Sequence, residues 1–188
     1  LRSVGETGGR MVLVCGEAGI GKSSFIEGFL NQIDPSHTTA VAWCDPLNTP
    51  RPLGPVRDLS ARLLTADMAG MGEAEYFEGL VNLAQEAQQT LVLVIEDLHW
   101  VDQKSLDWLV FIGRRLSQLP ILLIGSYRDD EIGPSHGLLN VLAAIPAPRK
   151  TYIDLPALTL DDVRQMGAHD RYSAEELHNI TSGHPYFV

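Results

Sequence analysis

Three glycines and a lysine crowd into one short stretch near the start of the chain, GEAGIGKSS (residues 16–24). The stretch fits G-x-x-x-x-G-K-[ST], the pattern of a phosphate-binding loop. Glycines allow successive backbone N–H groups to point toward one anion, and a helix starting there adds the positive end of its dipole. We therefore expect these residues to bind the phosphates of a nucleotide: Gly16, Glu17, Ala18, Gly19, Ile20, Gly21, Lys22, Ser23 and Ser24.

Two side chains of this loop have expected roles. Lys22 would reach the β- and γ-phosphates, and the Ser23 hydroxyl would ligate Mg²⁺. The flanking residues fit, because RMVLVC (10–15) has the pattern of a buried strand and KSSFIEGFLNQI (22–33) has apolar residues at helical spacing. This context favours a nucleotide site over a glycine-rich turn with a solvated lysine.

A second stretch, LVLVIEDLHWVD (91–102), is an apolar strand that ends in two acids, Glu96 and Asp97. Mg²⁺ prefers oxygen ligands and keeps several waters, so one carboxylate can hold it while the other orients or deprotonates an attacking water. In a parallel sheet both acids emerge at the edge where the phosphate loop lies. We expect Ser23, Glu96 and Asp97 to surround Mg²⁺, with Asp97 positioning the water and Glu96 helping to hold the metal.

The rest of the chain alternates between two periodicities. Apolar runs predict strands, and segments with helical spacing separate them. This alternation predicts an α/β fold with a five-stranded parallel sheet and helices on both faces. The expected strands are 11–15, 39–44, 90–95, 121–127 and 151–155, and the expected helices are 22–33, 55–65, 73–88, 103–118 and 137–144.

Strand patterns stop after residue 155. Thr159 with Asp162, and Ser173 with Glu176, predict capping boxes at the starts of two short helices. We therefore expect a P-loop core over residues 1–156 and the start of a small, truncated helical lid over 157–188. The loop 48–55 contains three prolines and has no firm predicted structure.

Composition restricts the function classes. The chain has 188 residues, with 14 Lys and Arg against 24 Asp and Glu, and a net charge of −10. Such an acidic domain repels nucleic-acid backbones, so we expect no direct nucleic-acid binding by this piece. No apolar run approaches a membrane span and no signal peptide is visible, so we expect a cytoplasmic protein with no membrane partner. Cys15 and Cys44 read as free thiols, and the ends of the chain suggest a piece excised from a longer protein.

GEAGIGKSS, LVLVIEDLHWVD and ILLIGSYRDDE (121–131) together resemble the P-loop ATPase module of the STAND class. These multidomain signal-transduction ATPases include bacterial LuxR-type regulators and ATPases fused to adenylate cyclase domains. RPLGPVRDLSARL resembles the helix after their second strand, and TSGHPYFV resembles the G-x-P motif of their lid, so the resemblance spans nearly the whole chain. It implies a P-loop NTPase core with an additional strand between the phosphate-loop strand and the acidic strand. It also implies ATP or ADP with Mg²⁺ as cofactors.

The same resemblance implies roles for two further residues. Arg128 matches the position that approaches the γ-phosphate, and Pro185 matches a lid proline that packs near the adenine. The acid pair Glu96–Asp97 departs from the two aspartates that are commoner in the family. Which acid serves the metal therefore stays open.

These observations favour an ATP-binding, slowly hydrolysing switch module of a larger signalling or transcription-regulating protein. Its expected partners are the nucleotide, other domains of the same polypeptide and a nucleotide-dependent homo-oligomer. A small-molecule kinase or other phosphotransferase is the alternative; it needs a basic lid, whereas the chain has Arg51, Arg57 and Arg62 around its second helix. A motor using Arg114 or Arg115 in trans, and a binding module without hydrolysis, are weaker alternatives.

Several remaining residues are assigned to the scaffold. Asp102 is expected to cap the helix that begins at Gln103. His99 and Trp100 are expected to pack or to position their neighbours. A helical stripe is expected in the core, formed by Trp108, Leu109, Ile112 and Leu116.

Overall fold

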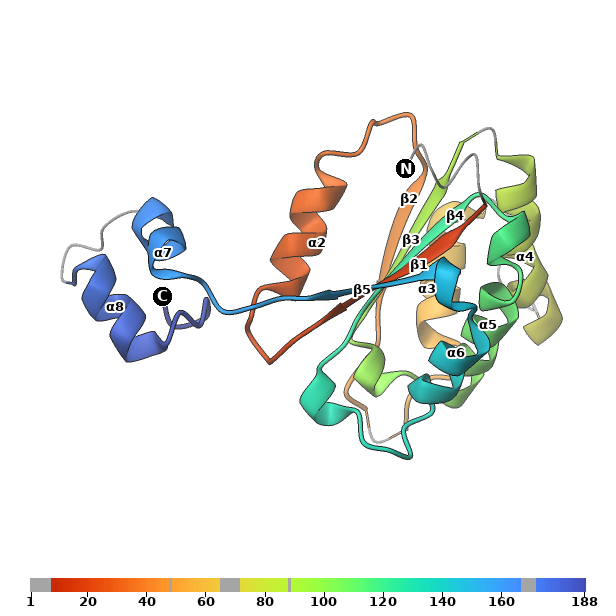
Figure 1. Ribbon diagram of the computed structural model, residues 1–188. Helices are drawn as coiled ribbons and strands as arrows, with labels where there is room; N and C mark the ends of the chain where they lie inside the picture. Colours follow the sequence, from red (N-terminus) through yellow and green to blue (C-terminus); the bar gives the residue numbers. More distant parts are fainter. Residues whose placement is uncertain (1–7, 48, 65–71, 88, 167–171) are drawn as a thin grey trace.

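The computed structural model describes the chain over residues 8–47, 49–64, 72–87, 89–166 and 172–188 (Figure 1). Within these stretches, five parallel strands form one sheet in the order β2-β3-β4-β1-β5. The predicted five-stranded parallel sheet is confirmed. The strands are β1 (Arg10–Cys15), β2 (Thr39–Trp43), β3 (Leu91–Glu96), β4 (Ile121–Ser126) and β5 (Lys150–Asp154).

The acidic strand β3 is separated from the phosphate-loop strand β1 by β4, which confirms the predicted additional strand. Every residue of β3 and β4 is buried, as expected for strands that are covered on both faces. Gly125 of β4 pairs with Leu13 on one side and with Ile95 on the other. Because the strands are parallel, the residues that follow β1, β3 and β4 gather at one edge of the sheet.

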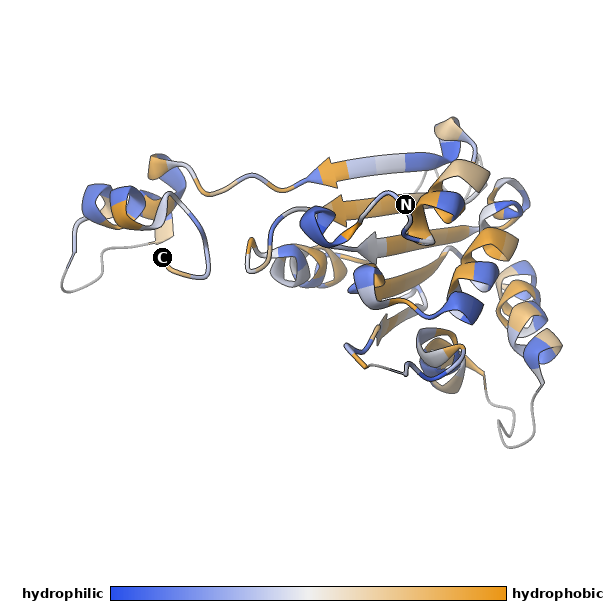
Figure 2. Ribbon diagram, turned by 90° about the horizontal axis from the view of Figure 1, so that it is seen from below, coloured by the Kyte–Doolittle hydropathy of each residue, from blue (hydrophilic) through white to orange (hydrophobic). Residues whose placement is uncertain are grey.

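Helices cover both faces of the sheet. Helix α2 lies on one face, and α3, α4, α5 and α6 cover the other (Figures 1 and 2). Alternate side chains of β3 enter the two cores: Leu93 packs under the four helices, whereas Val92 and Val94 pack under α2. The helices are α2 (Lys22–Leu30), α3 (Gly54–Leu63), α4 (Glu73–Glu86), α5 (Gln103–Gly113), α6 (Leu138–Ala144), α7 (Leu160–Met166) and α8 (Ala174–Thr181), and the 3-10 turns are η1 (Leu98–Trp100), η2 (Leu116–Gln118), η3 (Asp129–Glu131) and η4 (Ala147–Arg149).

Two helices end before the predicted residue. Helix α2 ends at Leu30 rather than at 33, and α5 ends at Gly113 rather than at 118. After α5 the chain tightens into η2, and this turn keeps Leu116 fully buried while it leads the chain back toward β4. The predicted core stripe of α5 and η2 is confirmed, because its four side chains are at most 1% exposed. The predicted ends of α3 and α4, at 65 and 88, lie outside the described residues.

Asp102 caps α5 as predicted and has a second role. Its Oδ1 accepts the backbone N–H of Ser105 at 3.0 Å and also that of Leu53 at 3.0 Å. Leu53 lies just before α3 and has a left-handed backbone, with φ of 58°. Asp102 therefore joins the start of α5 to the turn that precedes α3, and this contact orders the end of the proline-rich loop.

The two short helices α7 and α8 pack against each other beyond β5, to one side of the sheet (Figure 1). Both predicted capping boxes are confirmed. The Thr159 N–H donates to Asp162 Oδ2 at 2.8 Å, and the Asp162 N–H donates to Thr159 Oγ1 at 3.2 Å. The Ser173 N–H donates to Glu176 at 2.9 Å, and the reverse bond is 3.2 Å.

Both cysteines are free thiols, and burial raises the pKa of Cys44.

Among the helices of the described stretches, none is long and apolar enough to cross a membrane.

Candidate nucleotide-binding site

The phosphate loop runs from the end of β1 to the start of α2, as the motif predicted. Gly16 has φ of 139° and Gly21 has φ of 97°, which are left-handed conformations that favour glycine. At Gly16 a Cβ atom would also lie 3.1 Å from the Ile20 side chain. Helix α2 begins directly after Gly21 at Lys22, so its free N–H groups face the loop.

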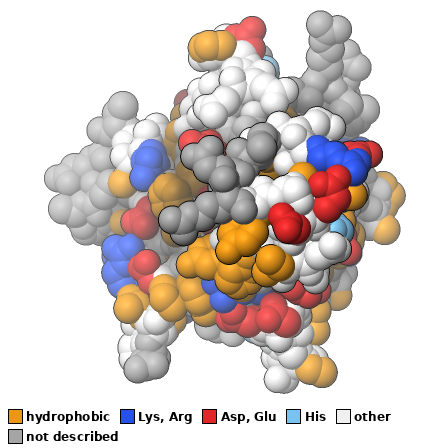
Figure 3. Space-filling view, turned by 90° about the vertical axis from the view of Figure 1, so that its left-hand side faces the viewer, with side chains coloured by type: hydrophobic (Ala, Val, Ile, Leu, Met, Phe, Trp, Pro, Cys, Tyr) orange, Lys and Arg blue, Asp and Glu red, His pale blue; other side chains and the backbone are white. Residues whose placement is uncertain are grey.

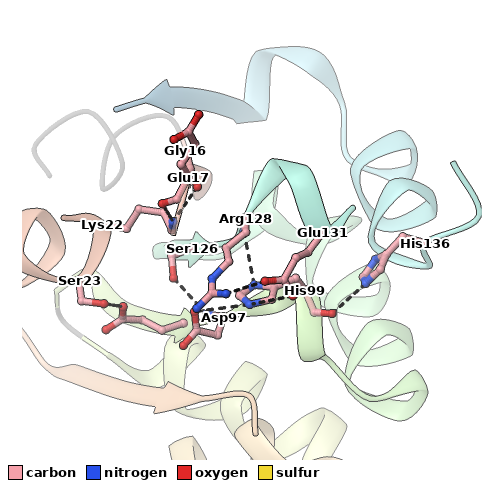
Figure 4. Close-up of polar contacts among 11 residues, drawn as sticks. Gly16, Glu17, Lys22, Ser23, Asp97, His99, Ser126, Arg128, Glu131 and His136 are labelled. Carbon is pink, nitrogen blue, oxygen red and sulfur yellow. Dashed lines mark hydrogen bonds and ion pairs between the residues drawn. The ribbon is translucent and has the colours of Figure 1, made fainter. Parts of the chain in front are cut away.

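The Lys22 ammonium lies inside the loop. Its Nζ donates to the backbone oxygens of Gly16 and Glu17, both at 2.7 Å (Figure 4). Burial lowers the pKa of Lys22, and the nearby positive charge of Arg128 lowers it further, while Asp97 raises it. Two cations therefore lie close together, an arrangement that a phosphate group would stabilise.

Ser23 and Glu96, which the sequence places 73 residues apart, are in direct contact. The Ser23 hydroxyl donates to Glu96 Oε2 (Figure 4). Glu96 ends β3 and is only 5% exposed. A hydroxyl and a carboxylate are the oxygen ligands that suit Mg²⁺, which is commonly held by one or two carboxylates together with phosphate oxygens. In the described part of the chain, no group of three or more His, Cys, Asp or Glu residues could hold a metal by itself. Ser23 and Glu96 therefore fit a Mg²⁺ ion that is bound jointly by these two side chains and by the phosphates of a nucleotide.

Asp97 points away from the Ser23–Glu96 contact. Its backbone is left-handed, with φ of 60°, and its N–H donates to the Ser126 hydroxyl at 3.1 Å. A non-glycine residue in this conformation is strained, and such residues cluster at functional sites. The side chain is 32% exposed, and Oδ1 lies 3.9 Å from His99 Nε2. The two adjacent acids therefore face different groups, Glu96 toward α2 and Asp97 toward His99.

Arg128 follows β4 and lies at the same edge. Its Nη1 forms an ion pair with Glu131 Oε1 at 2.6 Å (Figure 4). Its guanidinium lies 5.3 Å from the centre of the Trp100 ring. The two side chains of the pair are 30% and 35% exposed. The expected γ-phosphate contact stays a prediction; in this structure the guanidinium is held by Glu131.

His99 is the buried centre of this arrangement. Burial lowers its pKa, although Glu131 and Asp97 oppose this effect, so the ring is neutral at neutral pH. Its Nδ1 accepts the backbone N–H of Arg128 at 3.4 Å, and its ring lies 4.4 Å from that of Trp100. His99 therefore packs as predicted and also makes a polar contact with the backbone of Arg128, two residues after β4.

A cleft of about 680 Å³ lies between the phosphate loop and the end of α8 with the residues that follow it. Its volume is in the range of small-molecule sites. Pro185 does not line it, but the neighbours His184 and Phe187 do. The lining residues are Gly16, Glu17, Ile20, Asp129, Asp154, Leu155, Pro156, Ala157, Ile180, Thr181, Ser182, His184 and Phe187.

Sequence reasoning missed His184, which bridges the two sides of this cleft. Its Nε2 lies 2.8 Å from the carbonyl oxygen of Ala18, at hydrogen-bond distance. It also missed Asp154, although the position of this residue at the end of an expected strand was a usable signal. Asp154 pairs with Cys15 in the sheet and therefore emerges beside the phosphate loop.

The family comparison agrees with this geometry. Residues 1–124 match the family described as "AAA ATPase domain". No curated protein sequence matches the chain. The predicted resemblance to a STAND-class P-loop ATPase module is in accord with the family match and with the structural likenesses below.

Solved structures share the fold at low sequence identity. The Aeropyrum pernix ORC2 protein, solved in ADPNP–ADP complexes, is 15% identical with a TM-score of 0.63, over 97% of this chain and 53% of its own. A Walker-type ATPase of Pyrococcus abyssi is 14% identical with a TM-score of 0.60, over 98% and 63%. A STAND protein with a tetratricopeptide repeat sensor from Pyrococcus horikoshii is 17% identical with a TM-score of 0.57, over 97% and 27%. This chain thus spans less than two thirds of each of these proteins.

The family match covers about two thirds of the chain, including the phosphate loop, both acids and most of β4. The chain belongs to the AAA ATPase domain family.

Proposed function

We propose that this chain is the Mg²⁺–ATP-binding, slowly ATP-hydrolysing switch module of a larger signalling or transcription-regulating protein. The cleft is the observation that best supports the proposal, because Ile20 lines it from the core and His184 lines it from the lid. A nucleotide bound there would contact both parts. A ligand shifts a conformational equilibrium only through different affinities for the two states, and ATP and ADP differ in the contacts they can make.

The proposal gives each phosphate-site residue a role. The backbone N–H groups of residues 16–24 would bind phosphate oxygens, and Lys22 would exchange its two loop carbonyls for the β- and γ-phosphates. Ser23 and Glu96 would hold Mg²⁺, which when bound neutralises phosphate charge. Asp97, which is more exposed than Glu96 and faces away from Ser23, would position the attacking water.

Arg128 and the lid would recognise the two ends of the nucleotide. Arg128 would leave Glu131 to contact the γ-phosphate, a contact that ADP does not offer. Pro185 would lie near the adenine, and the lining by His184 and Phe187 on either side of it supports this placement. We expect turnover near that of a GTPase without its activator, about 10⁻⁴ to 10⁻² s⁻¹, as for a switch rather than a fast catalyst.

The remaining assignments concern the larger protein. We propose a core over residues 1–156 and a lid that starts at 157, with contacts to other domains of the same polypeptide and a nucleotide-dependent homo-oligomer in the cytoplasm. Figure 3 shows hydrophobic side chains gathered on the lid end of the molecule. Ile180, Tyr186 and Phe187 of this region are 65–77% exposed, which fits burial against another domain. The acidic charge argues against nucleic acid as a direct partner.

The alternative, a small-molecule kinase, is less well supported. A kinase lid needs mobile basic residues over the transferred phosphate. In the described part of the lid, Arg164 forms ion pairs with Asp161 at 2.8 Å and with Glu175 at 2.6 Å. This arginine is engaged within the lid and does not line the cleft.

Thermal unfolding with Mg²⁺–ATP or Mg²⁺–ADP tests the proposal. Ligand at 100 times its dissociation constant stabilises by about 2.7 kcal/mol, which for this size raises the melting temperature by roughly 5–10 °C. Lys22→Ala should remove most of this shift and the ATP turnover. Lys104→Ala is the matched control, because Lys104 is exposed and paired with Glu73. A wild-type chain that shows no shift in millimolar nucleotide, or that transfers phosphate to an added acceptor faster than to water, would contradict the proposal.

A further inference from the structure

His99 has a ring nitrogen without a hydrogen-bond partner although its side chain is completely buried. Nδ1 accepts the backbone N–H of Arg128, so in the neutral ring the proton is on Nε2. This Nε2 atom makes no hydrogen bond. A buried donor without an acceptor is unfavourable, so the N–H group has a strong preference for any acceptor that comes within reach.

Two carboxylates face this N–H group. Asp97 Oδ1 lies 3.9 Å from Nε2, and Glu131 Oε2 lies 3.8 Å from it (Figure 4). Glu131 is already paired with Arg128 through its other oxygen. Within the described residues, the carboxylate of Asp97 accepts no hydrogen bond. Asp97 therefore has both carboxylate oxygens available as acceptors, one for His99 and one for a water, whereas one oxygen of Glu131 is engaged by Arg128.

The histidine is fixed more firmly than the aspartate. The Trp100 ring contacts that of His99, and the His99 carbonyl oxygen lies 3.1 Å from His136 Nε2. His136 Nδ1 accepts the N–H of Leu138, so its Nε2–H is the donor in that contact. Asp97, by contrast, is about one third exposed. A rotation of the Asp97 side chain can shorten the gap to about 3 Å, the length of a hydrogen bond.

We propose that His99 is a positioning residue for ATP hydrolysis, whose Nε2–H donates to Asp97 Oδ1 and so directs the second oxygen of Asp97 to the attacking water. The inference rests on the proposed function, because Asp97 needs a water to position. A carboxylate that is bonded at one oxygen keeps the other in a defined place, and small errors in such placement reduce rates strongly.

Two substitutions separate positioning from packing. His99→Asn can keep an acceptor for the Arg128 N–H but has no group at the place of Nε2. His99→Gln can place an amide N–H there. We expect His99→Asn to lower kcat about 10- to 100-fold with KM for ATP nearly unchanged, and His99→Gln to stay within about threefold of wild type. His37→Asn is the matched control, since His37 precedes β2 at the opposite edge of the sheet.

The outcomes distinguish this inference from the proposed function. Wild-type turnover that does not depend on Lys22 would contradict the function itself. Lys22-dependent turnover with an unchanged kcat in His99→Asn, or with equal losses in both His99 variants, would overturn the positioning role alone. If the variants do not fold, ¹⁵N spectra of the wild-type histidines decide: a proton on Nδ1 of His99 contradicts the proposal, and one on Nε2 supports it.

Discussion

Arg128 is the side chain whose partner should change between ADP and ATP. In the structure its guanidinium is paired with Glu131 at 2.6 Å and lies against Trp100. A contact with the γ-phosphate requires this pair to separate. Glu131 therefore competes with the γ-phosphate of the nucleotide for Arg128.

The size of the effect follows from the two partners. A hydrogen bond between charged groups contributes about 1.5–3 kcal/mol. The Arg128–Glu131 pair is roughly one third exposed, so solvent screening limits it to about 1 kcal/mol or less. With the pair at about 1 kcal/mol, the difference predicts that Arg128→Ala weakens ATP binding by about 0.5–2 kcal/mol, or roughly 2- to 30-fold in Kd. ADP has no γ-phosphate, so its affinity should hardly change.

A change at Glu131 should have the opposite sign. Glu131→Gln removes the negative charge that holds the guanidinium, while the side chain keeps its size. ATP should then bind up to about fivefold more tightly, which corresponds to the lost competition of at most about 1 kcal/mol.

Titration calorimetry with ADP and with a non-hydrolysable ATP analogue measures both variants. Arg62→Ala is a matched control, because Arg62 also lies over a tryptophan, Trp43, but on α3. Equal losses for the two nucleotides in Arg128→Ala would refute the γ-phosphate contact. Weaker ATP binding in Glu131→Gln would refute the competition.

Two further predictions follow from contacts of the acids. Asp97→Asn should keep ATP binding and abolish turnover, whereas Glu96→Gln should raise the Mg²⁺ concentration needed for binding; normal turnover in Asp97→Asn would show that this acid is not the one that positions water. Asp102→Ala should lower the free energy of unfolding by about 2 kcal/mol and the melting temperature by roughly 4–8 °C, because it removes a helix cap and the acceptor of the Leu53 N–H. Calorimetry should show no such loss for Asp107→Ala, an exposed acid of the same helix.

The strands and helices could be predicted from the sequence because their signals are local. Apolar runs gave β3 within one residue, and glycine spacing located the phosphate loop. The end of α5 was not predictable in this way. Leu116 continues the apolar period of the helix, so periodicity alone extends the helix through it, whereas the turn toward β4 depends on tertiary packing.

The partners of the site residues depended on contacts that no local pattern encodes. The motif predicted that Ser23 and Glu96 would lie near each other, because both follow from the parallel sheet. It could not predict the left-handed backbone of Asp97, which turns that acid away from its neighbour. It also could not predict the contact of His184 with Ala18, since 166 residues separate the two.

Two histidines connect the phosphate site to the parts of the chain that should respond to nucleotide. His184 ties the proposed lid to the phosphate loop at Ala18, and His99 ties the end of β3 to the backbone of Arg128. Each contact ends at a residue, Ala18 or Arg128, that the proposed function assigns to phosphate binding. A change in what the loop binds can therefore reach the lid and Arg128 while the buried strands stay in place. On this reasoning the proposed switch requires movement only of the proposed lid, which has few buried residues, and of one partly exposed arginine side chain, so that little buried surface is disrupted.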